Sequence, residues 1–358
     1  MARALQLARR GMYTTAPNPR VGSVLVKDRQ VVGQGWHERA GGPHAEVAAL
    51  AEAGGAARGA DCYVTLEPCV HFGRTPPCTT ALIDAGVARV VAAMQDPNPL
   101  VSGRGIQALV DAGIATSSGL LRNEAAELNR GFVMRMSAGR PFVRVKLALS
   151  ADGFTAVAGD GDRGITGGAA RADVQRLRAE SCAVVTGIGT VLADDPRLNV
   201  RKDALGDRQP LRVVLDRGLR FPAGASMLKL PGRTIVVTQS RDHKRHVDLH
   251  AAGAEIAVLD GSAGEFAGAA LKYLAEKEQV NEVLVEAGMT LAGAVLSMQL
   301  ADELVVYQSR VALGAKGRAA FHPLQAHGDA ERAGLKLIDR RAVGVDWRLT
   351  FRRPMGQT

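Results

Sequence analysis

The chain has 358 residues and a net charge of +9 at pH 7, with 46% hydrophobic and 23% charged residues. This composition excludes an intrinsically disordered protein, and the length favours two ordinary domains over one. No run of about 18 uncharged apolar residues occurs, which excludes a membrane-spanning helix.

The positive charge is spread along the chain. Residues 1–140 hold 15 Lys/Arg against 11 Asp/Glu, and the remainder holds 30 against 25. A nucleic-acid-binding protein would gather this charge into a tail or stripe, and 4% aromatic residues offer little surface for stacking on bases. We therefore expect no nucleic-acid partner and a phosphorylated small molecule as the target of local arginines. Residues 1–10 interleave charged and apolar residues, unlike a secretory signal, so the expected compartment is the cytoplasm.

Helices and strands alternate through the first 139 residues, a pattern typical of an α/β fold. The amphipathic stretch 122–137 is predicted as a helix, and the Gly139-Arg-Pro141 break after it is the expected boundary between domains 1–139 and 140–358. In chain order, the elements expected before that stretch are a helix at about 2–12, a hairpin-like pair of strands at 21–27 and 31–36, a helix at about 44–53, a strand at 62–66, a helix at about 77–85, a strand at 87–93, and a further helix and strand.

The second domain continues the α/β alternation. A strand at 142–149 leads into a turn at Asp152-Gly153. The other predicted elements are a helix at 168–180, strands at 183–186 and near 211–215, 234–238, 255–258 and 281–286, a helix at about 289–298, and a strand-rich tail from Leu304.

Two short segments indicate a metal centre in the first domain. His44-Ala-Glu46 opens a predicted helix, and Glu67-Pro-Cys69 ends a strand shortly before Cys78 opens another helix. One imidazole and two thiolates suit Zn²⁺, and helix N-termini favour the thiolate form. Three protein ligands leave a fourth position for water, whose pKa zinc lowers towards about 7, so we expect a catalytic rather than a structural zinc.

Glu46 is the expected proton shuttle, because a carboxylate two residues from the histidine can take a proton from water and pass it to a leaving amine. The set is similar to the H-x-E…P-C-x-x-C signature of zinc deaminases, although eight residues rather than two separate the cysteines. The other two cysteines, Cys62 and Cys182, start strand-like apolar runs and are predicted to be core thiols.

Longer segments around these residues resemble one family. They are Pro17-Asn-Pro-Arg-Val-Gly22, Gly42-Pro-His-Ala-Glu46, Val64-Thr-Leu-Glu-Pro-Cys-Val-His-Phe-Gly-Arg-Thr-Pro-Pro-Cys78 and Met94-Gln-Asp-Pro-Asn-Pro99. The family is that of the bifunctional riboflavin-biosynthesis proteins, in which a diaminohydroxyphosphoribosylaminopyrimidine deaminase is fused to a 5-amino-6-(5-phosphoribosylamino)uracil reductase. The long spacing between the cysteines separates it from the cytidine and tRNA-adenosine deaminases.

This resemblance covers nearly the whole chain. For the first domain it implies a cytidine-deaminase-like α/β/α fold with one zinc per chain, held by His44, Cys69 and Cys78, with Glu46 as the shuttle. The substrate contacts that it implies here, each of which could instead cap a turn, are Asn18, His71, Asp96 and Asn98.

The residues alone indicate less about the second domain. No G-x-G-x-x-G follows a predicted strand, and Gly187-Ile-Gly189 lacks the third glycine, so a Rossmann dinucleotide site is unsupported. Within 285–294 a strand ends, Gly288 permits a tight turn and a helix begins, whose free N–H groups would face a cofactor phosphate.

Resemblance to the same family implies a dihydrofolate-reductase-like second domain that binds NADPH. The implied substrate contacts are Arg178, Leu198, Arg201 and Glu286, and the two arginines suit a ribose phosphate because they offer forked cationic donors. The implied cofactor contacts are Ala148, Thr190, Asp194, Arg217 and the turn Gly288, Met289, Thr290, Leu291, Ala292, Gly293 and Ala294.

One loop of the second domain departs from the family. Relatives usually read Ser-x-Trp-Ile-Thr-Gly, with the Ser at the substrate and the Trp beside the cofactor, where this chain reads Asp162-Arg-Gly-Ile-Thr-Gly167. Asp162 therefore replaces a hydroxyl, and Gly164 replaces a large aromatic surface. We expect a reductase that retains activity but binds NADPH or substrate less tightly.

The leading hypothesis is two consecutive reactions on a phosphoribosylaminopyrimidine. Zinc-dependent hydrolytic deamination would convert 2,5-diamino-6-(5-phosphoribosylamino)pyrimidin-4-one to 5-amino-6-(5-phosphoribosylamino)uracil, and NADPH would then reduce the ribosyl to the ribityl side chain. The alternatives are a nucleic-acid or nucleoside base deaminase with an accessory domain, and a non-catalytic regulator that keeps a zinc fold. The resemblance also implies a homo-oligomer, either a dimer or a tetramer.

Overall fold

Residues 1–70, 76–157, 165–201, 208–262, 264–314, 317–319, 328 and 330–354 are described by the computed structural model. The chain divides into two units, Met1–Arg140 and Pro141–Thr358, within the Gly139-Arg-Pro141 segment.

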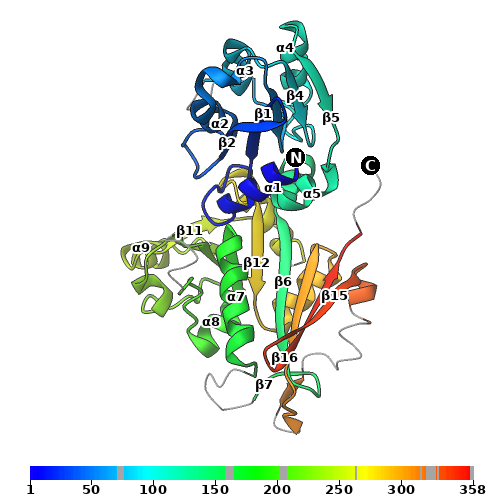
Figure 1. Ribbon diagram of the computed structural model, residues 1–358. Helices are drawn as coiled ribbons and strands as arrows, with labels where there is room; N and C mark the ends of the chain where they lie inside the picture. The colour runs from blue at the N-terminus through cyan, green and yellow to red at the C-terminus, as the bar shows by residue number, and fades with distance from the viewer. Residues whose placement is uncertain are drawn as a thin grey trace. The chain divides into compact units, whose positions relative to one another are not determined.

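The first unit is built on a mixed sheet of five strands in the order β2-β1-β3-β4-β5 (Figure 1). Strand β1 runs antiparallel to β2 and β3, whereas β3, β4 and β5 are parallel to one another. The strands are β1 (Gly22–Lys27), β2 (Gln30–Trp36), β3 (Asp61–Val64), β4 (Arg89–Ala92) and β5 (Ala115–Ser118).

Helices cover both faces of this sheet. Helices α2, α3 and α4 pack on the face that carries Leu25 and Cys62, and α1, α5 and α6 pack on the opposite face. The unit is therefore a three-layer α/β/α sandwich. The helices are α1 (Ala2–Ala8), α2 (Ala45–Ala53), α3 (Cys78–Ala85), α4 (Arg104–Asp111), α5 (Arg122–Leu128) and α6 (Arg130–Ala138).

Two glycines of β2 allow helix α2 to lie directly on the sheet. A Cβ at Gly33 would stand 2.3 Å from the carbonyl oxygen of Ala49, and one at Gly35 would stand 2.7 Å from that of Ala45. Both oxygens belong to the backbone of α2, which cannot move aside as a side chain can. Any side chain at these two positions would therefore push the helix off the strand.

The single helix expected over 122–137 is wrong. The structure breaks it at Asn129 into α5 and α6. The Asn129 side chain accepts a hydrogen bond from the N–H of Arg20 (2.7 Å) and donates one to its carbonyl (2.9 Å), and the Arg20 guanidinium donates to the carbonyl of Leu128 (2.7 Å). The guanidinium thus satisfies a carbonyl that the break releases, which hydrophobic periodicity cannot reveal.

The second unit contains a nine-stranded sheet in the order β11-β10-β9-β8-β12-β6-β13-β16-β15. Neighbours are parallel from β11 to β13, and β16 and β15 add an antiparallel edge. The carboxyl ends of β9, β8, β12 and β6 therefore lie along one edge. The strands are β6 (Phe142–Leu149), β8 (Ala183–Gly187), β9 (Leu211–Leu215), β10 (Thr234–Thr238), β11 (Glu255–Val258), β12 (Glu282–Glu286), β13 (Glu303–Gln308), β15 (Lys336–Val343) and β16 (Asp346–Arg352), with a separate pair formed by β7 (Phe154–Val157) and β14 (Gly317–Ala319).

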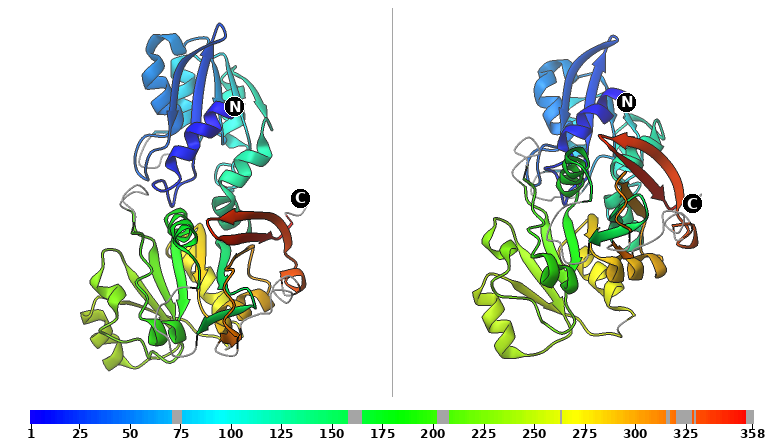
Figure 2. Two further views of the ribbon diagram at one scale, coloured as in Figure 1. Left: turned by 60° about the horizontal axis from the view of Figure 1, so that its bottom comes forward. Right: turned by 90° about the horizontal axis from the view of Figure 1, so that it is seen from below.

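Helices also cover both faces of the second sheet (Figure 2): α7, α8 and α9 pack on one face, and α10 and α11 on the other. The α/β class expected from the alternation of elements is confirmed in both units. In the part of the chain that the structure describes, no helix is long and apolar enough to cross a membrane. The helices are α7 (Gly168–Glu180), α8 (Ile188–Asp194), α9 (His243–Ala251), α10 (Phe266–Glu276) and α11 (Met289–Ser297).

The close approach of α2 to β2 predicts a specific loss of stability. We expect Gly33→Ala to lower the free energy of unfolding of the first unit by roughly 2 kcal/mol, because the added methyl group meets backbone atoms of α2. Gly55→Ala is the matched control, since a Cβ at Gly55 meets no atom within 4 Å. Thermal unfolding followed by circular dichroism compares the two variants with the original protein. Equal midpoints for both variants would show that α2 can shift away from the strand without cost.

Candidate active sites

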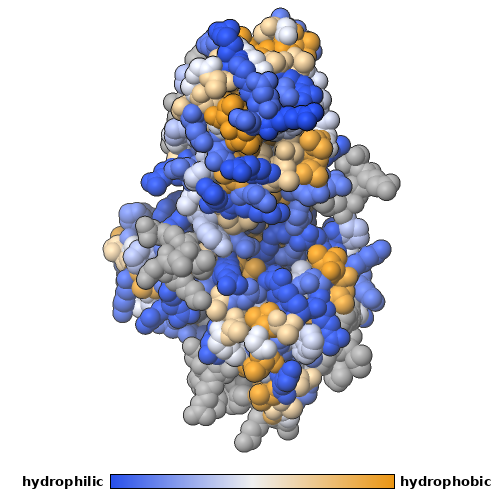
Figure 3. Space-filling model, in the orientation of Figure 1, coloured by the Kyte–Doolittle hydropathy of each residue, from blue (hydrophilic) through white to orange (hydrophobic). Residues whose placement is uncertain are grey.

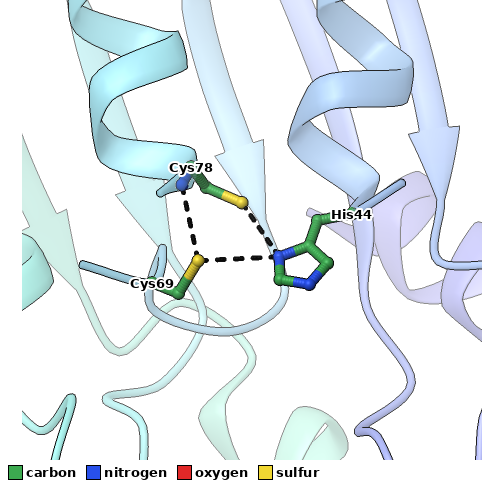
Figure 4. A group of neighbouring side chains, drawn as sticks. All are labelled: His44, Cys69 and Cys78. Atoms are coloured by element: carbon green, nitrogen blue, oxygen red, sulfur yellow. Dashed lines mark hydrogen bonds between the residues drawn. The ribbon is translucent and has the colours of Figure 1, made fainter. Parts of the chain in front are cut away.

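Three side chains from separate segments of the first unit converge at the N-termini of two helices (Figure 4). His44 is the N-cap residue of α2, Cys78 is the first residue of α3, and Cys69 lies in the loop after β3. The His44 Nδ1 atom is 3.1 Å from the Cys78 Sγ and 3.6 Å from the Cys69 Sγ, and the three ligand atoms all lie within 4.8 Å of one another.

This geometry fits a zinc ion. In a tetrahedral site with Zn–S bonds of about 2.3 Å and Zn–N bonds of about 2.0 Å, the ligand atoms stand about 3.5–3.8 Å apart. The hydrogen bond from Cys78 lowers the pKa of the Cys69 thiol to about 4, so one thiolate forms readily. The backbone N–H of Cys78 also donates to the Cys69 sulfur over 3.4 Å. The residues predicted as ligands therefore lie together, with a donor set that zinc prefers.

Glu46 lies in the first turn of α2 and is almost completely buried, with 4% of its surface exposed. Burial raises the pKa of its carboxyl group to about 7, and the group interacts with Cys69, His44 and Cys78. A carboxyl group with such a pKa holds or releases a proton near neutral pH, as a general acid–base group must. The structure thus brings the predicted shuttle beside the predicted metal ligands.

His37 is a site residue that the sequence did not reveal. Its ring meets that of His44 edge-on, with 5.4 Å between the centroids. The His37 Nδ1 atom lies 2.9 Å from the carbonyl oxygen of Pro43, and its Nε2 atom lies 3.0 Å from the side-chain amide of Asn18. Because a carbonyl only accepts, Nδ1 carries the proton and Nε2 accepts from Asn18. Asn18, predicted as a substrate contact, therefore orients His37.

The predicted contacts Asp96 and Asn98 lie in the loop after β4. The Asp96 side chain accepts a hydrogen bond from the N–H of Asn98 (2.8 Å), and the Asn98 side chain accepts one from Leu100 (3.1 Å). Both side chains thus stabilise turns, as polar residues of this kind often do. The fourth predicted contact, His71, lies outside the described residues.

The second unit brings several predicted residues to the carboxyl edge of its parallel strands. The N–H of Gly288, the N-cap residue of α11, donates to the Thr190 hydroxyl of α8 (3.2 Å), so the ends of β12 and β8 are joined. The strand β12 and the helix α11 are joined by Ala287 and Gly288 alone, and Gly288 has a φ of −67°, which any residue adopts, so its backbone conformation does not require a glycine. The remaining predicted residues of this turn, Met289, Thr290, Leu291, Ala292, Gly293 and Ala294, form the first turns of α11.

Arg178 and Glu286 form a buried pair between α7 and β12. The Arg178 Nε and Nη2 atoms lie 2.5 and 2.9 Å from the two carboxylate oxygens, and its Nη1 donates to the carbonyl of Asn199 (3.0 Å). Although burial opposes ionisation, Arg178 keeps the pKa of Glu286 below its usual value. The fork expected to bind a phosphate is therefore already engaged by a carboxylate.

Lys146 completes this group and was not predicted. It lies on β6 directly opposite Glu286 in the paired strands. Burial lowers the pKa of its ammonium group, and the charge of Arg178 acts in the same direction, while Glu286 opposes both. A lysine with a lowered pKa is a better proton donor than an exposed one.

The other predicted residues of the second unit are more dispersed. Leu198 is buried and has a φ of 49°. The backbone N–H of Arg201 donates to the side chain of Gln175, a residue of α7 (2.9 Å). Ala148 lies near the carboxyl end of β6, Asp194 ends α8, and the Arg217 side chain donates to Gln239 (2.8 Å) beyond the end of β9. The two departing residues, Asp162 and Gly164, lie outside the described residues.

Comparisons with known proteins cover both units. Residues 1–94 match the family described as "Cytidine and deoxycytidylate deaminase zinc-binding region", and residues 141–349 match "RibD C-terminal domain". "Riboflavin biosynthesis protein RibD" of Escherichia coli (strain K12) is 47% identical over 97% of this chain and 96% of that protein. The protein of the same name from Haemophilus influenzae is 44% identical over 98% of this chain and 96% of its own length.

Solved structures give the same result. Acinetobacter baumannii RibD (form 1) matches with a TM-score of 0.88 at 44% identity, over 99% of this chain and 98% of that chain. A diaminohydroxyphosphoribosylaminopyrimidine deaminase/5-amino-6-(5-phosphoribosylamino)uracil reductase from Thermotoga maritima matches with a TM-score of 0.84 at 31% identity, over 99% and 97%.

These matches confirm the fold class expected for both units, a cytidine-deaminase-like and a dihydrofolate-reductase-like domain, together with zinc and NADPH as the cofactors. The chain is an enzyme, and it belongs to the RibD family of bifunctional riboflavin-biosynthesis enzymes, which combine a deaminase with a reductase.

Proposed function

We propose that domain 1–139 deaminates 2,5-diamino-6-(5-phosphoribosylamino)pyrimidin-4-one and that domain 140–358 reduces the resulting ribosyl group to ribityl with NADPH. The observation that carries this proposal is the cluster of His44, Cys69 and Cys78 with the buried Glu46 beside it. The substrate named for the Thermotoga maritima protein supports the choice of pyrimidine.

In the deaminase site His44, Cys69 and Cys78 would hold the zinc, which when bound supplies a Lewis acid that lowers the pKa of water to about 7. Glu46 accepts the proton that the attacking water loses and delivers it to the exocyclic amine that leaves as ammonia. Its burial serves both steps, because a carboxyl group with a pKa near 7 accepts and donates with similar ease. His37, held by Asn18 and Pro43, fixes the ring of His44 from the side.

In the reductase site the cofactor supplies the hydride. Arg178 holds the Glu286 carboxylate in one orientation, in which it can accept a hydrogen bond from a ribose hydroxyl. Lys146 lies beside this carboxylate and is proposed to donate the proton to the ribose oxygen. The N-terminal N–H groups of α11 suit a cofactor phosphate.

A nucleic-acid or nucleoside base deaminase is disfavoured, because the matches extend over the whole second unit. We further propose a homo-oligomer, a dimer or a tetramer. The edge hairpin β15–β16 supports it, since Leu337, Ile338 and Val345 expose 43%, 52% and 63% of their surface, and hydrophobic residues show over this hairpin in Figure 3. The cytoplasm is the proposed compartment. It is supported by the four cysteines, which are all free thiols.

Removing either thiolate should remove the metal. We expect Cys69→Ser and Cys78→Ser to lose the zinc, about one ion per chain in the original protein, together with deamination, because three ligands are the minimum for a catalytic site. Cys182→Ser, outside the cluster, is the control. Elemental analysis and ammonia release measure both effects. If both ligand variants keep full zinc and activity, the metal is bound elsewhere.

Glu46→Gln should separate metal binding from proton transfer. We expect it to keep the zinc and to lose deamination by at least about 10²-fold, the usual worth of a positioned acid–base group. Glu52→Gln, on the exposed side of the same helix, should keep both. Reduction, assayed with the deaminated substrate, should not change. An equal loss of both activities would contradict two independent sites.

Lys146→Met should act only on the reduction. The methionine keeps the length and packing of the side chain but removes the proton, so we expect the reductase kcat to fall at least about 10²-fold while deamination is unaffected. Lys272→Met, on the exposed face of α10, is the control. NADPH oxidation is followed by absorbance. Equal rates for the two variants would remove Lys146 from the reaction.

A further inference from the structure

Glu67, the residue two positions before the ligand Cys69, has a side chain that accepts four backbone hydrogen bonds. One carboxylate oxygen accepts from the N–H groups of Asp96 and Gly103, both at 3.0 Å. The other accepts from Gly105 at 2.8 Å and from Ile106 at 3.1 Å. Only 3% of the residue is exposed, so water does not compete for these bonds.

These bonds connect three parts of the deaminase site. Glu67 itself continues from β3 and leads into Pro68 and Cys69. Asp96 lies in the loop after β4, and Gly105 and Ile106 belong to the first turn of α4, the helix that follows this loop. The carboxylate therefore ties the loop to the strand end that delivers a metal ligand. The backbone N–H of Glu67 adds a fifth bond, to the carbonyl of Met94 at 3.0 Å.

The backbone of α4 packs tightly against the carboxylate and the residue that follows it. A Cβ at Gly105 would stand 2.1 Å from the carbonyl oxygen of Pro68 and 3.0 Å from the Glu67 side chain. The first turn of α4 thus rests on the backbone that joins Glu67 to Cys69. A displacement of the loop would move against this backbone.

Only a carboxylate satisfies the arrangement. Its two oxygens both accept, and each can accept two N–H groups. A glutamine offers one oxygen and one NH₂ group, and the NH₂ group would face two N–H donors that are left without an acceptor. Gly103, Gly105 and Ile106 all lie at the N-terminus of α4, so capping of this helix would require only their three bonds. The bond to Asp96 is additional, and it holds the loop that precedes the helix.

We propose that Glu67 is a positioning residue of the deamination reaction: it holds the loop with Asp96 and Asn98 at a fixed place relative to the metal ligand Cys69. The inference rests on the proposed function and on the expectation, from the family resemblance, that Asp96 and Asn98 contact the pyrimidine substrate. The Glu67 carboxylate accepts its hydrogen bonds from the loop and from α4, and in the described part of the chain it makes none to Glu46, His44 or Cys78. Its loss therefore affects substrate binding more than proton transfer.

Glu67→Gln tests this role through the separate kinetic constants of the deaminase. We expect the KM for the pyrimidine to rise about tenfold or more, with kcat changed by less than about threefold and with zinc and reductase activity retained. Glu67→Asp keeps the charge but shortens the side chain, so it should give a smaller rise in KM. It carries the test if the glutamine variant does not fold. Glu124→Gln, an exposed carboxylate of α5, is the control and should match the original protein.

Three results would overturn the proposal. An unchanged KM in folded, zinc-loaded Glu67 variants would show that the residue only caps helix α4. Loss of zinc would show that Glu67 holds Cys69 rather than the loop. An equal fall in kcat at constant KM would place its effect on the chemical step. The proposed function fails separately, if Glu46→Gln deaminates the pyrimidine at the original rate.

Discussion

The deaminase centre depends on how closely helix α2 approaches strand β2. His44 and Glu46 both lie at the start of this helix, so their distance from the two cysteines is set by where the helix rests on the sheet. Gly33 and Gly35 let backbone meet backbone at that contact. Such a contact has no side-chain rotamers to adjust, and it fixes the helix more sharply than an interdigitated apolar layer would. The position of the metal ligand His44 therefore depends on Gly33 and Gly35, two residues without a functional group.

Chemistry-bearing residues of the first unit were predictable because few residue types bind zinc and their order along the chain is fixed by the α/β scaffold. His44, Cys69 and Cys78 each stand at the end of an element that the pattern predicts, and the structure brings them together. The roles of His37 and Glu67 were not predictable. Glu67 depends on backbone N–H groups of residues 96–106, and His37 depends on the side chain of Asn18 and the carbonyl oxygen of Pro43. Neither periodicity nor residue type indicates such partners.

The second unit shows the same limit in another form. Its strands and helices could be predicted from their hydrophobic pattern. The role of a charged residue, however, depends on which side chain or backbone group it contacts in the fold. Arg178 was predicted as a phosphate fork, but its donors are engaged by Glu286 and by the Asn199 carbonyl. The sequence shows Lys146 only as a polar residue in a strand, whereas the strand register pairs it with Glu286. Register between strands far apart in the chain is the information that a single sequence withholds.

The bond between Arg20 and Asn129 has a consequence for the order in which the protein is made. It spans 109 positions and anchors the segment that carries Asn18. A ribosome adds roughly 5–20 residues per second, so roughly 5–20 s pass between the synthesis of the segment with Asn18 and that of Asn129. The zinc ligands all emerge earlier than Asn129, and the second unit emerges later. The first unit can therefore form this contact on the nascent chain while the strands of the second unit are still being translated.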